Sequence, residues 1–292
     1  MKERAAKPTL AALRRAAGGR YLQLTAGLTY VVEDGPDEAS TFMLLHGATV
    51  PHWEFERLVP HLHAAGSRVV RFDLYGHGLS DRPAVEYDFG LFLGQALEVL
   101  DALRPARPLT LLGHSFGASI AAMIAAERPA LVERLVLVAP LLDFMTRSSW
   151  PRLLALPVVG RPLMRWVGVP ALARRRRRRY AAIGAEHLTP RFVAESRAPG
   201  YAEALASMFA SGALGDQRER YRRLHSGTRE IVVVAGTADR VVPLRDVARI
   251  RALLPQPHRY LEIADAEHSL LLTHPEVVAS ALAPRNGNTG QP

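Results

Sequence analysis

The chain contains no cysteine, and this absence removes several kinds of chemistry at once. It excludes disulfide bonds, a thiolate nucleophile and cysteine-ligated metal sites, and it fits the reducing cytoplasm. Long apolar runs are also lacking, because no stretch approaches the roughly 18 uninterrupted apolar residues of a membrane-spanning helix. Arg14 and Arg15 interrupt the first apolar patch, so we expect no signal peptide. The sequence therefore predicts a cytoplasmic protein.

Positive charge is concentrated in two segments of the chain, whose formal net charge is +9. Residues 1–20 carry six lysines and arginines against one glutamate, and residues 174–179 (Arg174 to Arg179) are all arginine. The rest of the chain is close to neutral, which argues against nucleic-acid binding. We expect residues 1–20 to form a loosely docked basic arm. Six consecutive arginines point all round a helix, so we expect a solvated surface there, with attraction of anionic substrates, acidic partners or membrane as the alternative.

Short apolar segments alternate with helical ones along most of the chain, which has 292 residues, 48% of them hydrophobic. Strands are expected at residues 21–25, 28–33, 42–45, 68–72, 109–112, 134–138, 231–234 and 260–263. An amphipathic helix should follow Asp88, which would cap it, and Pro60 should kink or divide a helix near residues 55–62. This alternation predicts an α/β fold, with a mostly parallel central sheet, helices on both faces and right-handed crossovers.

The alternation stops between residues 141 and 226, where no strand of that type occurs. We expect this segment to be a helical cap inserted into a core formed by residues 21–140 and 227–283. Such an insertion should lie over the carboxyl ends of the strands, where open α/β sheets bind ligands. The polar tail at residues 284–292 is expected to be disordered.

The stretch around Ser115 joins a predicted strand to a predicted helix through Gly113-His114-Ser115-Phe116-Gly117. A serine at the apex of so tight a turn has a strained backbone, and side chains two positions to either side would clash, so glycine is needed there. The turn would expose the Ser115 hydroxyl at the carboxyl edge of the sheet, next to the positive end of the helix dipole. Ser115 is therefore the candidate nucleophile.

A serine nucleophile needs a histidine base that is itself held by a carboxylate. His268 lies just past the last predicted strand, at the same sheet edge as Ser115, and is the candidate base. Asp239 occupies the matching loop after the preceding strand and is the candidate acid. Asp143 is the alternative acid, whereas Asp265 is expected only to shape its loop.

Two backbone N–H groups are candidates for the oxyanion hole. One belongs to Phe116, at the start of the elbow helix, and the other to Ala48, which follows His46-Gly47 at the end of an adjacent strand. Small residues there let the backbone approach a substrate.

The remaining conspicuous polar residues are expected to be structural. They are His46, Asp73, His77, Ser80 and His114. His52 and Trp53 are candidates for the mouth of the pocket, with contacts to core and cap as the alternative for Trp53.

These motifs together resemble the α/β-hydrolase superfamily, specifically its capped, cofactor-free serine hydrolases, over residues 20–283. The resemblance rests on His46-Gly47, the turn at residues 73–80, the Gly-x-Ser-x-Gly pentapeptide, Asp239 and His268. It implies ester-type hydrolysis through an acyl-enzyme, and the substrate we expect is a carboxylic ester of a small molecule. This chemistry calls for no metal or redox cofactor. From the charge distribution and the lack of long apolar runs, we expect neither nucleic-acid binding nor membrane contact. Serine at the elbow argues against the dehalogenase and epoxide hydrolase branches, where a carboxylate attacks. Acyl transfer, C–C bond hydrolysis and ligand binding without turnover are the alternatives.

Overall fold

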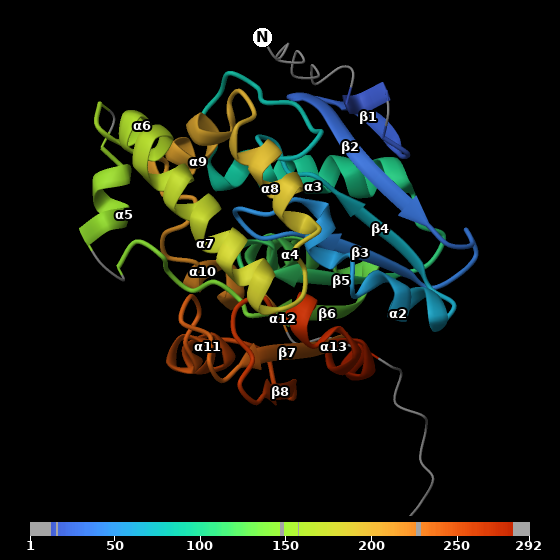
Figure 1. Cartoon of the computed structure of the whole chain (residues 1–292). Coiled ribbons are helices and arrows are strands. Elements are labelled where there is room, and N and C mark those ends of the chain that lie inside the picture. Colours follow the sequence, from blue (N-terminus) through green and yellow to red (C-terminus); the bar gives the residue numbers. More distant parts are fainter. Residues whose placement is uncertain (1–12, 16, 147–148, 157, 226–228, 283–292) are drawn as a thin grey trace, which may run out of the picture.

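A single eight-stranded sheet organises the molecule (Figure 1). The computed structural model describes residues 13–15, 17–146, 149–156, 158–225 and 229–282. The strands are β1 (Arg20–Leu24), β2 (Gly27–Asp34), β3 (Thr41–Leu45), β4 (Arg68–Phe72), β5 (Leu109–His114), β6 (Val132–Val138), β7 (Glu230–Gly236) and β8 (Arg259–Ile263). Their order in the sheet is β1-β2-β4-β3-β5-β6-β7-β8. Only β2 runs antiparallel to its neighbours, so the predicted mostly parallel sheet is confirmed.

Helices cover both faces of this sheet. The helices of the sheet domain are η1 (His52–Phe55), α2 (Val59–Ala64), α3 (Phe89–Leu103), α4 (Phe116–Glu127), η2 (Pro129–Leu131), α11 (Leu244–Arg251), α12 (Leu270–Thr273) and α13 (Pro275–Leu282). Helix α2 packs against α13, whereas α3 packs against α4, and α11 and α13 lie on opposite sides of β7 in Figure 1. The Asp88 carboxylate accepts the Leu91 N–H, as a cap should. The predicted helix is divided at residues 56–58, between η1 and α2, and Pro60 sits in the first turn of α2, where its missing N–H costs nothing.

The centre of the core is the β5–α4 unit. Every residue of β5 is buried, and so are residues 116–125 of α4. A helix that is apolar on all sides is stable only when it is enclosed, and α4 is enclosed by β5, β6, α3 and a helix of the insertion. The turn between β5 and α4 is therefore held rigidly on both sides.

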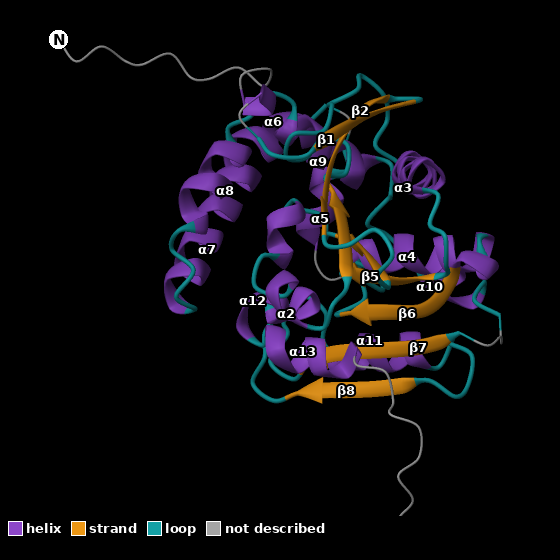
Figure 2. Ribbon diagram, turned by 90° about the vertical axis from the view of Figure 1, so that its right-hand side faces the viewer, coloured by secondary structure: helices purple, strands orange, loops and turns teal. Residues whose placement is uncertain are grey.

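Between β6 and β7 the described chain forms helices and no strand. These are α5 (Ser149–Leu154), α6 (Gly160–Leu163), the π-helix η3 (Met164–Gly168), α7 (Val169–Ala182), α8 (Leu188–Ser196), α9 (Tyr201–Ala210) and α10 (Arg218–Arg222). Figure 2 shows α7 and α8 on the side toward which the arrowheads of β6 and β8 point. The last helix, α10, packs on α4, where the Tyr221 hydroxyl donates to the Leu141 carbonyl over 2.9 Å.

Most of the predicted basic arm and the whole predicted tail, residues 284–292, lie outside the described residues. Arg14 is described, and its guanidinium donates to the Leu79 carbonyl at 2.9 Å and pairs with Asp81 at 2.6 Å. Within the described residues, no helix combines the length and the apolar character needed to cross a membrane.

Candidate active site

The turn between β5 and α4 has the strained geometry expected for Ser115. Its φ of 54° and ψ of −114° lie outside the regions that residues with side chains normally adopt. A Cβ added at Gly113 would lie 2.3 Å from the Gly117 carbonyl oxygen, and one added at Gly117 would lie 2.2 Å from the Leu45 carbonyl oxygen. Both contacts are with backbone, so glycine is required at both positions. Side chains at these two positions would therefore clash with the backbone, as the Gly-x-Ser-x-Gly spacing predicts.

Asp239 and His268 are joined directly across two loops. Asp239 follows β7 and His268 follows β8, and the Asp239 Oδ2 lies 2.7 Å from the His268 Nδ1. The other oxygen of Asp239 accepts the N–H groups of Val241 and Val242 at 2.7 and 2.8 Å. Because a carboxylate only accepts, the His268 Nδ1 carries the proton and, in the neutral ring, Nε2 carries the lone pair. That is the tautomer that a general base needs.

The electrostatics of this pair follow from burial and hydrogen bonding. Burial lowers the pKa of His268 below its ordinary value of 6.5, and the hydrogen bond and charge of Asp239 oppose this only in part. Burial alone would raise the pKa of Asp239, but the hydrogen bond and charge of His268 and the two backbone N–H groups outweigh it and lower the pKa. At neutral pH the pair is therefore a carboxylate and a neutral imidazole.

His114 links the loop of His268 to the Ser115 turn. The His114 Nε2 lies 3.0 Å from the His268 carbonyl oxygen, and the two imidazole rings are 4.7 Å apart between centroids. No hydrogen bond joins the Ser115 hydroxyl to His268 among the residues that the structure describes. The structure thus joins Asp239 to His268 and fastens the His268 loop to the residue before Ser115.

The backbone at the end of β3 faces the elbow. A Cβ built on Gly47 would lie 3.4 Å from the Ser115 Cβ, which is ordinary contact. The His46 Nε2 accepts the Leu74 N–H at 2.9 Å, so His46 Nδ1 carries the proton and donates to the Gly47 carbonyl at 2.7 Å. In a trans peptide the next N–H points opposite to that carbonyl, so His46 fixes the direction of the Ala48 N–H. The Phe116 N–H is the first of α4, where it has no partner within the helix.

Glu54 is a buried acid at the site that sequence reasoning missed. Its carboxylate is hydrogen-bonded to the His114 Nδ1 and accepts the Gly47 N–H at 3.4 Å. The side chains of Glu54 and His114 are only 8% and 7% exposed. His114, expected to pack beneath the turn, is therefore the middle of a chain of contacts from Glu54 to the His268 carbonyl. The only sequence signal was a glutamate between two aromatic residues, Trp53 and Phe55.

The turn at residues 73–80 is held by Asp73, as expected. Its Oδ1 lies 2.9 Å from the His52 N and 2.8 Å from the His52 Nδ1, and its Oδ2 accepts the Leu79 N–H at 2.9 Å. Burial would raise the pKa of Asp73, but His52 outweighs it and lowers the pKa to about 2. The Ser80 hydroxyl donates to the Asp73 carbonyl at 2.5 Å, and His77 contacts the Ala48 carbonyl at 3.0 Å.

Asp143, the alternative acid, serves its own loop. Its Oδ1 accepts the N–H groups of Met145 and Thr146 at 2.8 and 3.2 Å, whereas the carboxylate that contacts His268 belongs to Asp239. Asp265 has a φ of 55° and its N–H donates to the Thr237 hydroxyl, which fits a loop-shaping role.

Four arginines of the run at residues 174–179 face solvent and two contact loops near the candidate active site, which corrects the expectation of a fully solvated surface. All six lie on α7, and Arg174, Arg175, Arg177 and Arg178 are exposed. Arg176 donates to the Thr49 hydroxyl at 2.9 Å, and Arg179 pairs with Glu267 at 2.9 Å. Residues three apart share a helix face, so this face of α7 contacts both the loop after β3 and the loop that carries His268.

Trp53 packs against the insertion rather than standing free at a pocket mouth. It is 7% exposed and belongs to a small cluster with Tyr180, Leu188 and Phe192. His52 lies beside it and is bound to Asp73. Among the described residues, no group of three or more histidine, aspartate or glutamate side chains is placed to hold a metal ion.

Known proteins with similar sequences are hydrolases. The 2-hydroxymuconate semialdehyde hydrolase of Pseudomonas sp. (strain CF600) is 31% identical over 217 residues, which cover 70% of this chain and 71% of that protein. Human monoglyceride lipase is 37% identical over 129 residues, which cover 43% of this chain but only 41% of the lipase. A serine hydrolase-like protein of Dictyostelium discoideum matches over 29% of its own length, so this chain spans less than a third of that relative.

Solved structures give the same result for the fold. A hydrolase from Pseudomonas aeruginosa PA01 superposes with a TM-score of 0.72 at 25% identity and covers 91% of this chain and 97% of that one. The enol-lactonase from Burkholderia xenovorans LB400 has a TM-score of 0.74 at 20% identity, covering 90% and 98%. A sequence model described as alpha/beta hydrolase fold matches residues 40–275. The chain therefore belongs to the family of hydrolases with the alpha/beta hydrolase fold.

Proposed function

We propose that the chain is a serine hydrolase that cleaves a carboxylic ester of a small molecule through an acyl-enzyme. Ser115 is the nucleophile, His268 the general base and Asp239 the residue that holds the imidazole. The N–H groups of Ala48 and Phe116 form the oxyanion hole. We assign substrate selection to the inserted segment, residues 141–226, as the cap of this enzyme.

The observation that carries the proposal is the Asp239–His268 hydrogen bond of 2.7 Å on loops beside the strained Ser115 turn. This hydrogen bond joins two separate loops at the carboxyl edge of the sheet, and both side chains are largely buried. It leaves a histidine nitrogen with a free lone pair, and the contact of His114 with the His268 carbonyl ties the His268 loop to the residue before Ser115.

In this mechanism the Ser115 hydroxyl gives its proton to the His268 Nε2 while its oxygen forms a bond to the ester carbonyl carbon. The oxyanion that develops accepts the N–H groups of Ala48 and Phe116. The tetrahedral intermediate collapses, the alkoxide leaves with the proton from His268, and the acyl group stays on Ser115. Water then repeats the two steps and releases the acid. His268 is neutral at pH 7 because its pKa is lowered, so it is ready to accept the first proton.

The proposal is tested with Ser115→Ala and, as a matched control, Ser280→Ala, whose serine is exposed on α13. The wild type and the control should be labelled by a fluorophosphonate and should release a burst of p-nitrophenol from short p-nitrophenyl esters. Ser115→Ala should lose the labelling and about 10⁴-fold or more of the ester rate. Labelling of Ser115→Ala at the wild-type rate would place the nucleophile elsewhere. Absence of both labelling and p-nitrophenol release in the wild type would favour a ligand-binding protein without turnover.

C–C bond hydrolysis is a second candidate, favoured by the similarity to the 2-hydroxymuconate semialdehyde hydrolase of Pseudomonas sp. (strain CF600), which is matched over 71% of its length. It would use the same Ser115, His268 and Asp239. Arg176, which bonds the loop after Ala48, would suit the carboxylate that the name of that substrate implies. Rates on p-nitrophenyl esters of graded length, thioesters, lactones and a vinylogous diketo acid would distinguish ester hydrolysis from C–C bond hydrolysis. Acyl transfer would be detected as a new ester formed with an added alcohol.

A further inference from the structure

Exposed apolar side chains gather on one part of the insertion. Eight large apolar residues are strongly exposed in the described chain, and six of them lie within residues 153–167. We call these six the apolar ridge: Leu153, Leu156, Val158, Val159, Trp166 and Val167. Val158 is 85% exposed and Trp166 is 73% exposed. Single exposed apolar residues are ordinary on protein surfaces, but such a concentration marks an interaction surface.

Leu153 lies on α5 and Trp166 and Val167 on η3, whereas Leu156, Val158 and Val159 lie in the connection between α5 and α6. Helix α5 packs against α6, and α6 continues into η3. In Figure 1, α5 and α6 lie at the left margin of the molecule, away from the sheet. The ridge therefore projects outward, and no described element covers it.

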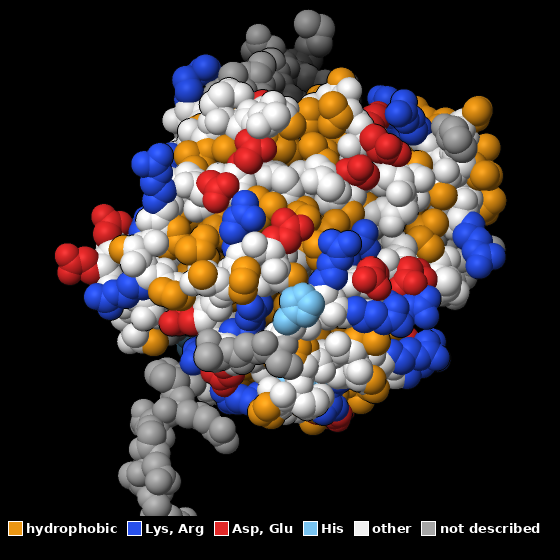
Figure 3. All heavy atoms as spheres, turned by 180° about the vertical axis from the view of Figure 1, so that it is seen from behind, with side chains coloured by type: hydrophobic (Ala, Val, Ile, Leu, Met, Phe, Trp, Pro, Cys, Tyr) orange, Lys and Arg blue, Asp and Glu red, His pale blue; other side chains and the backbone are white. Residues whose placement is uncertain are grey.

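The same segment carries charge of one sign only. Residues 144–185 contain ten arginines and no aspartate or glutamate. Seven of these arginines are exposed: Arg152, Arg161, Arg165, Arg174, Arg175, Arg177 and Arg178. On the face seen from behind, by contrast, basic and acidic side chains are interspersed (Figure 3). The segment that carries the apolar ridge thus contributes cations and no acidic side chain to the surface.

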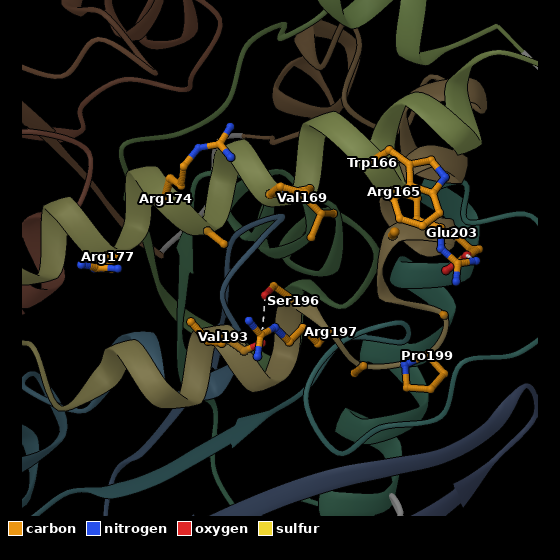
Figure 4. Close-up of a pocket in the computed structure, with 15 residues that line it drawn as sticks. Arg165, Trp166, Val169, Arg174, Arg177, Val193, Ser196, Arg197, Pro199 and Glu203 are labelled. Carbon is orange, nitrogen blue, oxygen red and sulfur yellow. Dashed lines mark hydrogen bonds and ion pairs between the residues drawn. The ribbon is translucent and has the colours of Figure 1, made fainter. Parts of the chain in front are cut away.

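A groove of about 880 Å³ begins at Trp166 and runs between α7 and α8. Its apolar lining includes Val169, Pro170 and Ala173, and its cations are Arg165, Arg174, Arg177 and Arg197 (Figure 4). Glu203 is its only acid and pairs with Arg165 at 3.6 Å. We call this the cationic groove. It is separate from the candidate active site, because Ser115, His268 and Asp239 do not line it.

We propose that the apolar ridge and the cationic groove together form a docking surface for anionic lipid bilayers. Such a bilayer offers anionic headgroups to the arginines and, just below them, the acyl boundary to Trp166 and Val158. Nucleic acid would pair with the arginines but leave the ridge in water. A second copy of the chain would bring the same positive surface to a symmetric contact, where the charges repel. The bilayer is the occupant that satisfies both features.

This inference takes up the alternative that the sequence left open for the arginine run, attraction to a membrane, in place of the expected solvated surface. The arginine run alone is compatible with a solvated surface. The exposure of the ridge, which depends on how α5, α6 and η3 pack, is what the sequence did not reveal.

The first experiment measures binding of the full chain to vesicles by flotation. Vesicles of phosphatidylcholine mixed with phosphatidylglycerol should bind at least about tenfold more tightly than phosphatidylcholine alone, and added salt should weaken the binding. Arg174→Gln with Arg177→Gln should lower this affinity at least about tenfold. The matched control, Arg245→Gln with Arg249→Gln, removes the same charge from exposed positions of α11 and should change it less than about twofold. Equal loss in both pairs, or binding independent of phosphatidylglycerol, would overturn the proposal.

The second experiment tests insertion of the ridge. Chain-brominated lipids should quench the fluorescence of Trp166 in the bound protein, and Trp166→Tyr should lose most of this quenching while the fold, checked by circular dichroism, is unchanged. Trp166→Ser with Val158→Ser should lower vesicle affinity at least about fivefold. Unquenched fluorescence would overturn insertion. Arginine-dependent binding to duplex DNA without vesicle binding would indicate that the surface binds nucleic acid instead of a bilayer. Dimerisation abolished by Trp166→Ser would indicate that it binds a second copy of the chain.

Discussion

Glu54→Gln tests the buried chain of contacts beneath the candidate active site. Glu54 and His114 are each less than one-tenth exposed, and their hydrogen bond replaces the water that each lost. Removing one partner of such a buried pair typically costs about 3–5 kcal/mol, because the other partner is left without compensation. For a chain of this size, 1 kcal/mol corresponds to roughly 2–4 °C in Tm. We therefore expect Tm to fall by about 6–20 °C.

Glu56→Gln is the matched control, two residues away. Glu56 pairs with His187 at 2.5 Å and with Arg191 at 3.8 Å, but the His187 side chain is 60% exposed. Pairs of this kind contribute about 0–1 kcal/mol. Thermal and urea unfolding should therefore separate the two variants clearly. Equal stability of Glu54→Gln and Glu56→Gln would refute the reasoning.

The same comparison has a pH dependence with a definite sign. Burial would raise the pKa of Glu54, but the charge and hydrogen bond of His114 outweigh it, so the pKa is lowered. A carboxyl whose folded pKa is depressed stabilises the protein above its unfolded pKa of about 4.3 and loses this contribution as the pH falls through the folded pKa. The stability difference between wild type and Glu54→Gln should therefore be largest near neutrality and shrink below about pH 4. A difference that grows in acid would contradict this.

Three further predictions concern the site. The kcat/KM for ester hydrolysis should fall in acid with an apparent pKa below 6.5, because burial lowers the pKa of His268 and only its neutral form accepts a proton; a midpoint above 6.5 would contradict this. Asp239→Asn should lower kcat by about 10⁴-fold and move this acid limb to still lower pH, because Asp239 raises the pKa of His268; an unmoved limb would argue against the pairing. Gly117→Ala should lower the free energy of unfolding by about 3 kcal/mol or more, because the added Cβ meets the Leu45 carbonyl oxygen at 2.2 Å. The control, Gly94→Ala in α3, should raise the free energy of unfolding by up to about 1 kcal/mol, because nothing lies within 4 Å of the added Cβ. Urea denaturation measures both.

The sheet was predictable because its strands are short apolar runs bounded by glycine, proline and aspartate. Residues 68–72 coincide with β4, and the other predicted strands differ from the observed ones by one or two residues at one or both ends. The loops that carry Asp239 and His268 followed from strand order alone, because the carboxyl ends of parallel strands meet at one edge.

What the sequence did not predict depends on the phase and packing of helices. Six identical arginines give no sign that Arg176 and Arg179 turn toward the site while their neighbours face solvent. Glu54 resembles a surface acid until the folding of η1 against β3 encloses it. In the same way, Val158 and Trp166 could be core residues of a cap, and only the arrangement of short helices leaves them outside.

Helix α7 is attached to the sheet domain at three points. Arg176 on α7 contacts the loop after β3, and Arg179 on α7 contacts the loop before α12. Arg57 of the sheet domain donates to the Ile183 carbonyl at the end of α7 at 3.2 Å, and to the Leu272 carbonyl of α12 at 2.9 Å. A displacement of α7 from the sheet domain would break the Arg176 and Arg179 contacts. Because Glu267 precedes His268, the position of α7 is thereby coupled to the loop that carries the candidate base.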